Sequence, residues 1–166
     1  MYETHADMLR SVIAAGENPL FEDLQGRNGL HYLAEVSLAL SSTRLAATPE
    51  DSSQVLYFRR KRYSEHLLAS GVNPNSYDRH GFTPLMAFII HTRDEESDNQ
   101  TTKLLWRLVK AGAHVNSRNR QGETALHLAV NLGRRNVTGF LISSGANVNA
   151  RANCRFGVLA LGLVGT

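Results

Sequence analysis

The stretch from residue 119 to residue 151 reads NRQGETALHLAVNLGRRNVTGFLISSGANVNAR and contains one complete structural unit. A turn around Gly122 is followed by Thr124, whose hydroxyl can accept a backbone N–H at the start of a helix. Apolar residues then recur at helical spacing in two successive segments. Gly145 follows the second segment, where a left-handed helix stop is needed. The stretch therefore predicts an extended finger followed by two short helices.

Two sets of glycines show that this unit is repeated along the chain. The glycines that stop the second helix recur at spacings of 41 and 33 residues, at Gly71, Gly112 and Gly145. A second set stands before the apolar runs and keeps the 41-residue spacing, in DLQGRNGLHYLA (23–34), DRHGFTPLMAFI (78–89) and NRQGETALHLAV (119–130). Two independent sets of glycines in one register indicate a repeat protein.

The motifs that carry these glycines resemble the ankyrin repeat. They are Gly81-x-Thr83-Pro84-Leu85, Gly122-x-Thr124-Ala125-Leu126-His127 and Gly145-Ala146-x-Val148-Asn149. The 33 residues between Gly112 and Gly145 match the period of that family. The resemblance implies an all-α solenoid of helix-turn-helix units with short β-hairpin-like finger loops. It also implies that His31 and His127 make structural hydrogen bonds to neighbouring backbone.

We expect residues 1–166 to form a single domain with about three repeats. Thr48 and Pro49 have the pattern of a helix start, which predicts one continuous helix from about Pro49 to Ala69. The expected units are an incomplete one at 4–16, repeat 1 at 22–77 with a long insertion at about 37–58, repeat 2 at 78–118 with a short acidic insertion at about 92–99, repeat 3 at 119–151, and a degenerate or truncated unit at 152–166.

Composition restricts the class of protein. The 166 residues are 42% AVILMFWYC and 20% charged, which is typical of a globular domain. No apolar run approaches the roughly 20 residues of a membrane span, and the first residues lack the features of a secretory signal. Cys154 is the only cysteine, so an internal disulfide is excluded. We therefore expect an intracellular protein, cytoplasmic or nuclear, rather than a secreted one.

The sequence contains no recognisable catalytic or metal-binding motif. None of its seven histidines pairs with another histidine or with Cys154 at metal-ligand spacing. The sequence patterns of a phosphate-binding loop and of a nucleophile elbow are also missing. We expect no enzyme activity, no cofactor and no bound metal.

Positive charge is concentrated in the C-terminal part of the chain. The formal net charge is +3, but residues 100–166 carry nine lysines and arginines against one acid. This asymmetry suggests an acidic partner, whether protein, nucleic acid or anionic membrane, or else a solvated basic face. The run Arg59, Arg60, Lys61 and Arg62 likewise has two interpretations. It is a nuclear-import or anion-binding patch, or it is the solvent face of the long helix, with Tyr63 and Leu67 turned to the core.

We interpret the protein as a protein–protein interaction scaffold that binds a partner, expected to be acidic, through finger loops and the concave surface of the inner helices. The alternatives are a basic nucleic-acid-associated nuclear module, or a fragment of a larger ankyrin-repeat protein whose effector domain lies elsewhere. The family pattern assigns partner binding to Tyr77, Arg79, His80, Phe82, Ile90, His91, Arg118, Arg120, Gln121, Glu123, Asn131, Leu132 and Arg151. Among these, Arg118, Arg120 and Arg151 are expected to steer an acidic segment. The repeat motif itself is assigned to Gly71, Thr83, Pro84, Leu85, Gly112, Thr124, Ala125, Leu126, His127 and Gly145.

Overall fold

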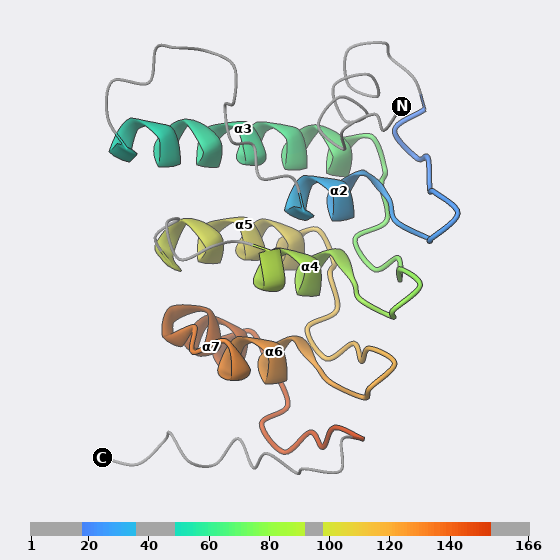
Figure 1. Ribbon diagram of the computed structural model, residues 1–166, viewed down its shortest axis with the longest axis vertical. Helices are drawn as coiled ribbons and strands as arrows, with labels where there is room; N and C mark the ends of the chain where they lie inside the picture. The colour runs from blue at the N-terminus through green and yellow to red at the C-terminus, as the bar shows by residue number, and fades with distance from the viewer. Residues whose placement is uncertain (1–17, 36–48, 92–97, 154–166) are drawn as a thin grey trace.

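The computed structural model describes residues 18–35, 49–91 and 98–153, which form six helices arranged in three pairs. These are α2 (Gly29–Glu35), α3 (Pro49–Ala69), α4 (Pro84–His91), α5 (Asp98–Lys110), α6 (Ala125–Asn131) and α7 (Arg135–Ser143). Figure 1 shows an inner row of α2, α4 and α6, and an outer row of α3, α5 and α7. The described residues form no β-strand, only an isolated antiparallel bridge between Arg118 and Thr124. The all-α solenoid predicted from the sequence is confirmed.

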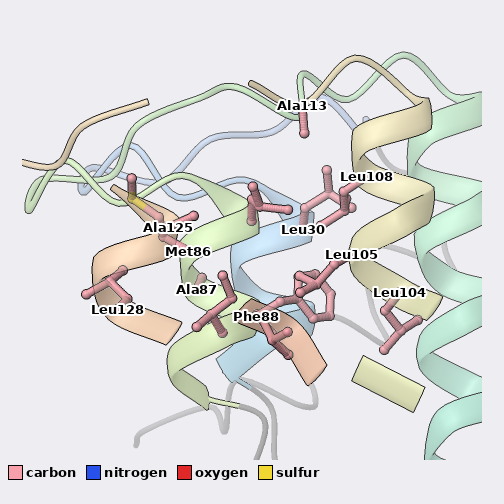
Figure 2. Close-up of a cluster of buried hydrophobic side chains, with 14 of the residues drawn as sticks. Leu30, Met86, Ala87, Phe88, Leu104, Leu105, Leu108, Ala113, Ala125 and Leu128 are labelled. Atoms are coloured by element: carbon pink, nitrogen blue, oxygen red, sulfur yellow. The ribbon is translucent and has the colours of Figure 1, made fainter. Parts of the chain in front are cut away.

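The hydrophobic core lies between the two rows of helices. Leu30 of α2, Phe88 of α4, and Leu105 and Leu108 of α5 are fully buried and belong to one contiguous cluster (Figure 2). Full burial of a side chain of this size contributes roughly 1.5–3 kcal/mol. Because each helix pair packs on its neighbours along the row, this burial stabilises the stack from one repeat to the next.

The inner helices α4 and α6 begin at the positions that the Thr-Pro and Thr-Ala motifs predict. Pro84 and Ala125 are their first residues, and the first helical position is where a missing N–H costs nothing. Thr124 is the N-cap residue of α6, with an extended backbone (φ −96°, ψ 168°). In α4 the backbone N–H of Met86 donates to Thr83 Oγ1 at 3.4 Å. Both threonines therefore act at helix N-termini, as predicted.

Glycine ends each outer helix in the left-handed conformation. The φ angles are 87° at Gly71, 95° at Gly112 and 88° at Gly145, a region that glycine adopts without steric cost. The N–H of the residue after each glycine donates to the carbonyl five positions earlier, at 2.9–3.1 Å. These bonds satisfy carbonyls that the helix end would leave without a partner. The three predicted helix stops are confirmed.

The long outer helix α3 spans Pro49–Ala69, as the sequence predicts. Residues 49–58 of the expected insertion thus form the first half of this helix. In the second repeat, α5 begins at Asp98, so the last two residues of the expected insertion at 92–99 belong to this helix. The other residues of the two expected insertions, 37–48 and 92–97, lie outside the described residues, as do the expected unit at 4–16 and residues 154–166.

Candidate functional site at the finger loops

Each finger is closed by the same set of bonds around an Asp or Asn at its first position. In the second finger Asp78 Oδ1 accepts the N–H of His80 and the N–H of Phe82, both at 2.8 Å. The N–H of Asp78 donates in turn to the Phe82 carbonyl at 3.0 Å. Asp23 and Asn119 accept the equivalent pairs of N–H groups in the first and third fingers. The three fingers therefore share one hydrogen-bonded frame, an arrangement that the turn chemistry of Asp and Asn favours.

Consecutive fingers are joined by one backbone hydrogen bond at each step. The N–H of Arg79 donates to the Gln25 carbonyl at 2.7 Å, and the N–H of Arg120 donates to the His80 carbonyl at 3.3 Å. At the next step the N–H of Asn153 donates to the Gln121 carbonyl at 2.9 Å. This close approach requires glycine: a Cβ on Gly81 would lie 2.8 Å from the Arg120 nitrogen, and Gly81 also has a φ of 78°. The fingers consequently form one continuous row at an edge of the molecule (Figure 1).

The predicted partner-binding residues that stand exposed on this row include Arg79, Arg120, Gln121 and Arg151. Arg79 Nε donates to Nε2 of the neighbouring His80 at 3.0 Å. Within the part of the chain that the structure describes, no hydrogen bond or ion pair engages the side chains of the other three. Their polar groups are therefore accessible to a partner.

Two other predicted residues are engaged in the framework. Arg118 Nη1 donates to the carbonyl of Gly122 at 2.9 Å and to that of Arg151 at 2.6 Å, so it ties the third finger to the segment that follows. Glu123 Oε2 accepts a hydrogen bond from Asn119 Nδ2 at 2.9 Å. The structure thus gives Arg118 and Glu123 bonds that hold the finger itself.

The remaining predicted residues extend the surface toward the inner helices. Tyr77 precedes the second finger and is half-exposed, while the Phe82 ring lies 6.3 Å from the His80 ring. Ile90, near the end of α4, is partly buried against the core. His91, Asn131 and Leu132, at or just after the ends of α4 and α6, are exposed. The predicted positions therefore combine exposed aromatic, polar and basic groups.

The two histidines at the motif position make structural hydrogen bonds, as the resemblance implies. His31 Nε2 donates to the Phe82 carbonyl at 3.0 Å, which joins α2 to the second finger. His127 Nδ1 accepts the N–H of Thr124 at 3.2 Å and lies 2.8 Å from its hydroxyl. Burial lowers the pKa of His31, although the bond to Phe82 opposes that effect. Among the described residues no group of three or more His, Cys, Asp or Glu could hold a metal ion.

A polar network in the first finger was not anticipated from the sequence. Arg27 forms ion pairs with Asp23 and Glu35, both at 2.9 Å, and Tyr32 donates its hydroxyl to Asp23 at 2.7 Å. Burial, together with the bond to Asp23, raises the pKa of Tyr32 to about 12. Burial alone would raise the pKa of Asp23, but the bonds from Tyr32 and Arg27 outweigh it and lower that pKa. The network stabilises the ionised form of Asp23 within the finger frame.

The basic run at residues 59–62 does not form one exposed patch. Arg60 is only 2% exposed and shares the core-facing side of α3 with Ser64 and Leu67. Lys61 is partly buried and Arg62 is exposed. An α-helix turns about 100° per residue, so four consecutive side chains point in almost every direction around it. The anion-binding patch and the solvent-exposed helix face both require Arg60 to be exposed, so both interpretations are wrong for this residue. The side chain of Arg59 lies outside the described residues.

Finger asparagines that bridge neighbouring repeats were also missed. Asn75 Nδ2 donates to the Gly112 carbonyl at 2.8 Å, and Asn75 Oδ1 accepts the N–H of His114 at 2.7 Å. Asn116 makes the same two bonds one repeat later, to Gly145 and Asn147, at 3.0 and 2.7 Å. The signal that could have revealed this bridge is the asparagine four residues after each helix-stop glycine.

Comparison with known proteins places the fold in a family. A family model for ankyrin repeats (three copies) matches residues 60–152, more than half of the chain. Rabankyrin-5 of Homo sapiens is 28% identical over 178 aligned positions, and the match covers 87% of this chain and 15% of that protein. The nuclear factor NF-kappa-B p105 subunit of Gallus gallus is 32% identical over 87 residues, covering 52% of this chain and 8% of that protein.

The chain thus spans less than a fifth of the length of these relatives. Ankyrin repeats generally serve as protein–protein interaction modules and are typically non-enzymatic. No helix in the described ranges has the length and apolar character needed to cross a bilayer. The matched repeats, the glycine spacing and the stacked fingers agree on one assignment: the chain belongs to the ankyrin-repeat family.

Proposed function

We propose that the protein is a binding scaffold whose row of fingers, together with the neighbouring ends of the inner helices, recognises an acidic segment of a protein partner. The observation that carries this proposal is the backbone bonding between consecutive fingers. It fixes their spacing while Arg120, Gln121 and Arg151 keep their side chains unengaged by the described residues. A surface that is already rigid loses little conformational entropy on binding.

The charges on the fingers support an acidic partner. The exposed tips carry Arg79, Arg120 and Arg151. The acids of the second and third fingers are bonded within those fingers, since Asp78 accepts backbone N–H groups and Glu123 accepts from Asn119. Basic side chains arranged in a row raise the association rate of an acidic segment and select against basic ones.

The surface also contains groups that contribute affinity beyond charge. Tyr77 is 49% exposed and Leu132 is 49% exposed, so each offers apolar area that a partner can cover. Aromatic and arginine side chains dominate the energetic hot spots of protein interfaces. This mixture favours a protein partner over a nucleic-acid backbone, and the burial of Arg60 supports the same choice because it interrupts the basic run on α3.

The test is a charge reversal on the fingers, Arg79→Glu with Arg120→Glu and Arg151→Glu. Arg118 is left unchanged because its guanidinium holds backbone carbonyls. A matched control reverses the same number of charges on the outer helices, Arg62→Glu with Lys103→Glu and Lys110→Glu, and so produces the same net charge. Both variants are first compared with the wild type by circular dichroism and thermal unfolding.

Partners are then captured from cell extract on each immobilised variant and identified by mass spectrometry. We expect the finger variant to lose the acidic partners that the wild type recovers, and the control variant to retain them. Recovery of the same proteins at the same yield by the wild type and the finger variant would show that the fingers are not the binding surface.

A further inference from the structure

The outer row of helices presents a second surface, on the side of the molecule away from the inner helices. On α5 the buried side chains Leu104, Leu105 and Leu108 face the core. Lys103, Trp106 and Lys110 stand at i, i+3 and i+7 on the opposite side of the helix and are exposed. Trp106 is 51% exposed, and Lys110 Nζ lies 4.9 Å from the centre of its ring. One face of α5 thus combines an accessible indole with two ammonium groups.

Helix α3 continues this face alongside α5. Arg107 of α5 joins the two helices. Its Nε donates to Glu65 Oε1 at 3.0 Å, and its Nη1 donates to the Tyr57 hydroxyl at 3.3 Å. The 41-residue offset between the glycines that end α3 and α5 makes Arg62 the structural equivalent of Lys103. Phe58, one turn before Arg62, is 59% exposed.

We define the outer basic–aromatic surface as Phe58, Arg62, Lys103, Trp106 and Lys110. No ion pair within the described residues involves its three basic side chains. The nearby acid, Glu65, is already paired with Arg107. Among the residues that the structure describes, this surface therefore combines three basic groups that form no ion pair with two large exposed aromatic rings.

We propose that this surface binds peripherally to the face of an anionic lipid bilayer. Tryptophan and phenylalanine side chains are stabilised in the interfacial zone of a bilayer, because the apolar ring is removed from water there while polar groups stay hydrated. Lysine and arginine place their long stems along apolar surface and keep the charged ends among anionic headgroups. An acidic peptide would satisfy the same charges, whereas a bilayer interface also offers one continuous plane to the aromatic rings of two neighbouring helices.

The arrangement of the outer helices fits contact with an extended plane. Helices α3, α5 and α7 lie side by side in one row (Figure 1). The corresponding exposed positions of α7 include Asn136 and Gly139, which are small and uncharged. The sequence of α7, RNVTGFLIS, contains no acid that would be repelled by anionic lipid. The fingers that carry the proposed protein-binding surface lie at another edge, so the two surfaces are independent.

Trp106 is the only tryptophan of the chain, so its fluorescence reports directly on this surface. The probe is a set of phosphatidylcholine vesicles with about 30% phosphatidylserine, compared with vesicles of phosphatidylcholine alone. For the wild type we expect a saturable blue shift of the emission with the anionic vesicles only. Quenching by brominated acyl chains should accompany the shift, because the ring enters the interface.

Three variants test which groups carry the binding. Arg62→Glu with Lys103→Glu and Lys110→Glu should weaken vesicle partitioning at least about a hundred-fold, since each basic residue contributes roughly five-fold at an anionic surface. Phe58→Ser keeps the tryptophan reporter and should weaken partitioning without removing its dependence on anionic lipid. The finger variant with Arg79, Arg120 and Arg151 changed to Glu has the same net charge as the first variant and should partition like the wild type.

The proposal fails if wild-type partitioning is absent or equal on neutral vesicles, or if both triple variants lose it equally, which would indicate net charge alone. It also fails if soluble polyglutamate or duplex DNA shifts the Trp106 emission and competes fully with the vesicles, which would assign the surface to an acidic macromolecule. If the outer triple variant does not fold, Lys103→Gln and Phe58→Ser provide the same comparison singly. Vesicle binding by the finger variant is measured separately from partner capture, so either proposal can fail alone.

Discussion

The start of an inner helix is fixed by side chains that bond to each other as well as to the backbone. In α6, Thr124 and His127 form a reciprocal pair, with His127 Nδ1 close to both the N–H and the hydroxyl of the threonine. In α2 the threonine is replaced by Asn28, whose Oδ1 accepts the N–H of Leu30 and whose Nδ2 donates to the Asn73 carbonyl. The sequence predicted a helix start at Thr124, but not that Asn28 would also bond to the carbonyl of Asn73, 45 residues away.

Replacing Thr124 by valine tests the reciprocal pair. The substitution preserves the shape of the side chain but removes the hydroxyl, and loss of an N-cap group costs about 1 kcal/mol of unfolding free energy. We expect a lower midpoint of urea unfolding for Thr124→Val and a nearly unchanged midpoint for Thr124→Ser, which keeps the oxygen. Identical midpoints for the valine variant and the wild type would remove the capping role.

His31 makes stability depend on pH. Its folded-state pKa lies below the ordinary value of 6.5, because burial outweighs the bond to Phe82 and the charges of Asp78 and Glu35. As pH falls below that value the unfolded chain takes up the proton first, so the unfolding free energy decreases until the folded-state pKa is reached. We expect the wild type to lose more stability between about pH 7.5 and about pH 5.5 than His31→Gln, whose amide cannot titrate there. Equal losses in chemical unfolding would contradict this expectation.

At the scale of the helix, periodicity and glycine positions predicted where the helices begin and end, whereas the direction of individual side chains was not predicted. The boundaries of α3 and the stops at Gly71, Gly112 and Gly145 followed from local signals that do not depend on tertiary contacts. The interpretation of residues 59–62 as an exposed basic surface was wrong for Arg60, because composition alone does not show that helical rotation turns this side chain toward the core. Arg118 was placed among partner-binding groups because the sequence does not show which carbonyls of the next segment come within reach.

Two glycines near the end of the outer row provide a matched test of helix formation. Gly139 lies within α7 and Gly145 just beyond it with a φ of 88°, and a Cβ at either position would meet no atom within 4 Å. Gly139→Ala should stabilise the protein by about 1 kcal/mol because alanine is the better helix former. Gly145→Ala should destabilise it by roughly 1–2 kcal/mol because alanine disfavours the left-handed region. Thermal unfolding should shift in opposite directions, and shifts of the same sign would contradict the assigned helix end.

In the molecule as a whole, three kinds of contact join neighbouring repeats and stabilise the stack. The core packs between the two rows of helices, single backbone bonds join the fingers, and Asn75 and Asn116 bridge to the helix stops at Gly112 and Gly145. The repeat register predicted the first of these from sequence. The other two depend on distances across the stack, which a single sequence does not reveal, and they determine which side chains on the fingers remain accessible to a partner.

The asparagine bridge between the second and third repeats gives the final prediction. Asn116→Ala removes two hydrogen bonds, to the Gly145 carbonyl and from the N–H of Asn147, and should lower the unfolding free energy by about 1–2 kcal/mol. Asn149 is the matched control, because its side chain makes no such bond within the described residues, and Asn149→Ala should change stability by less than about 0.5 kcal/mol. Since repeat proteins unfold as coupled neighbouring units, weakening one interface should also broaden the urea transition of the Asn116 variant. Equal effects of the two substitutions would mean that the bridge does not couple the repeats, and that packing between the helices does so alone.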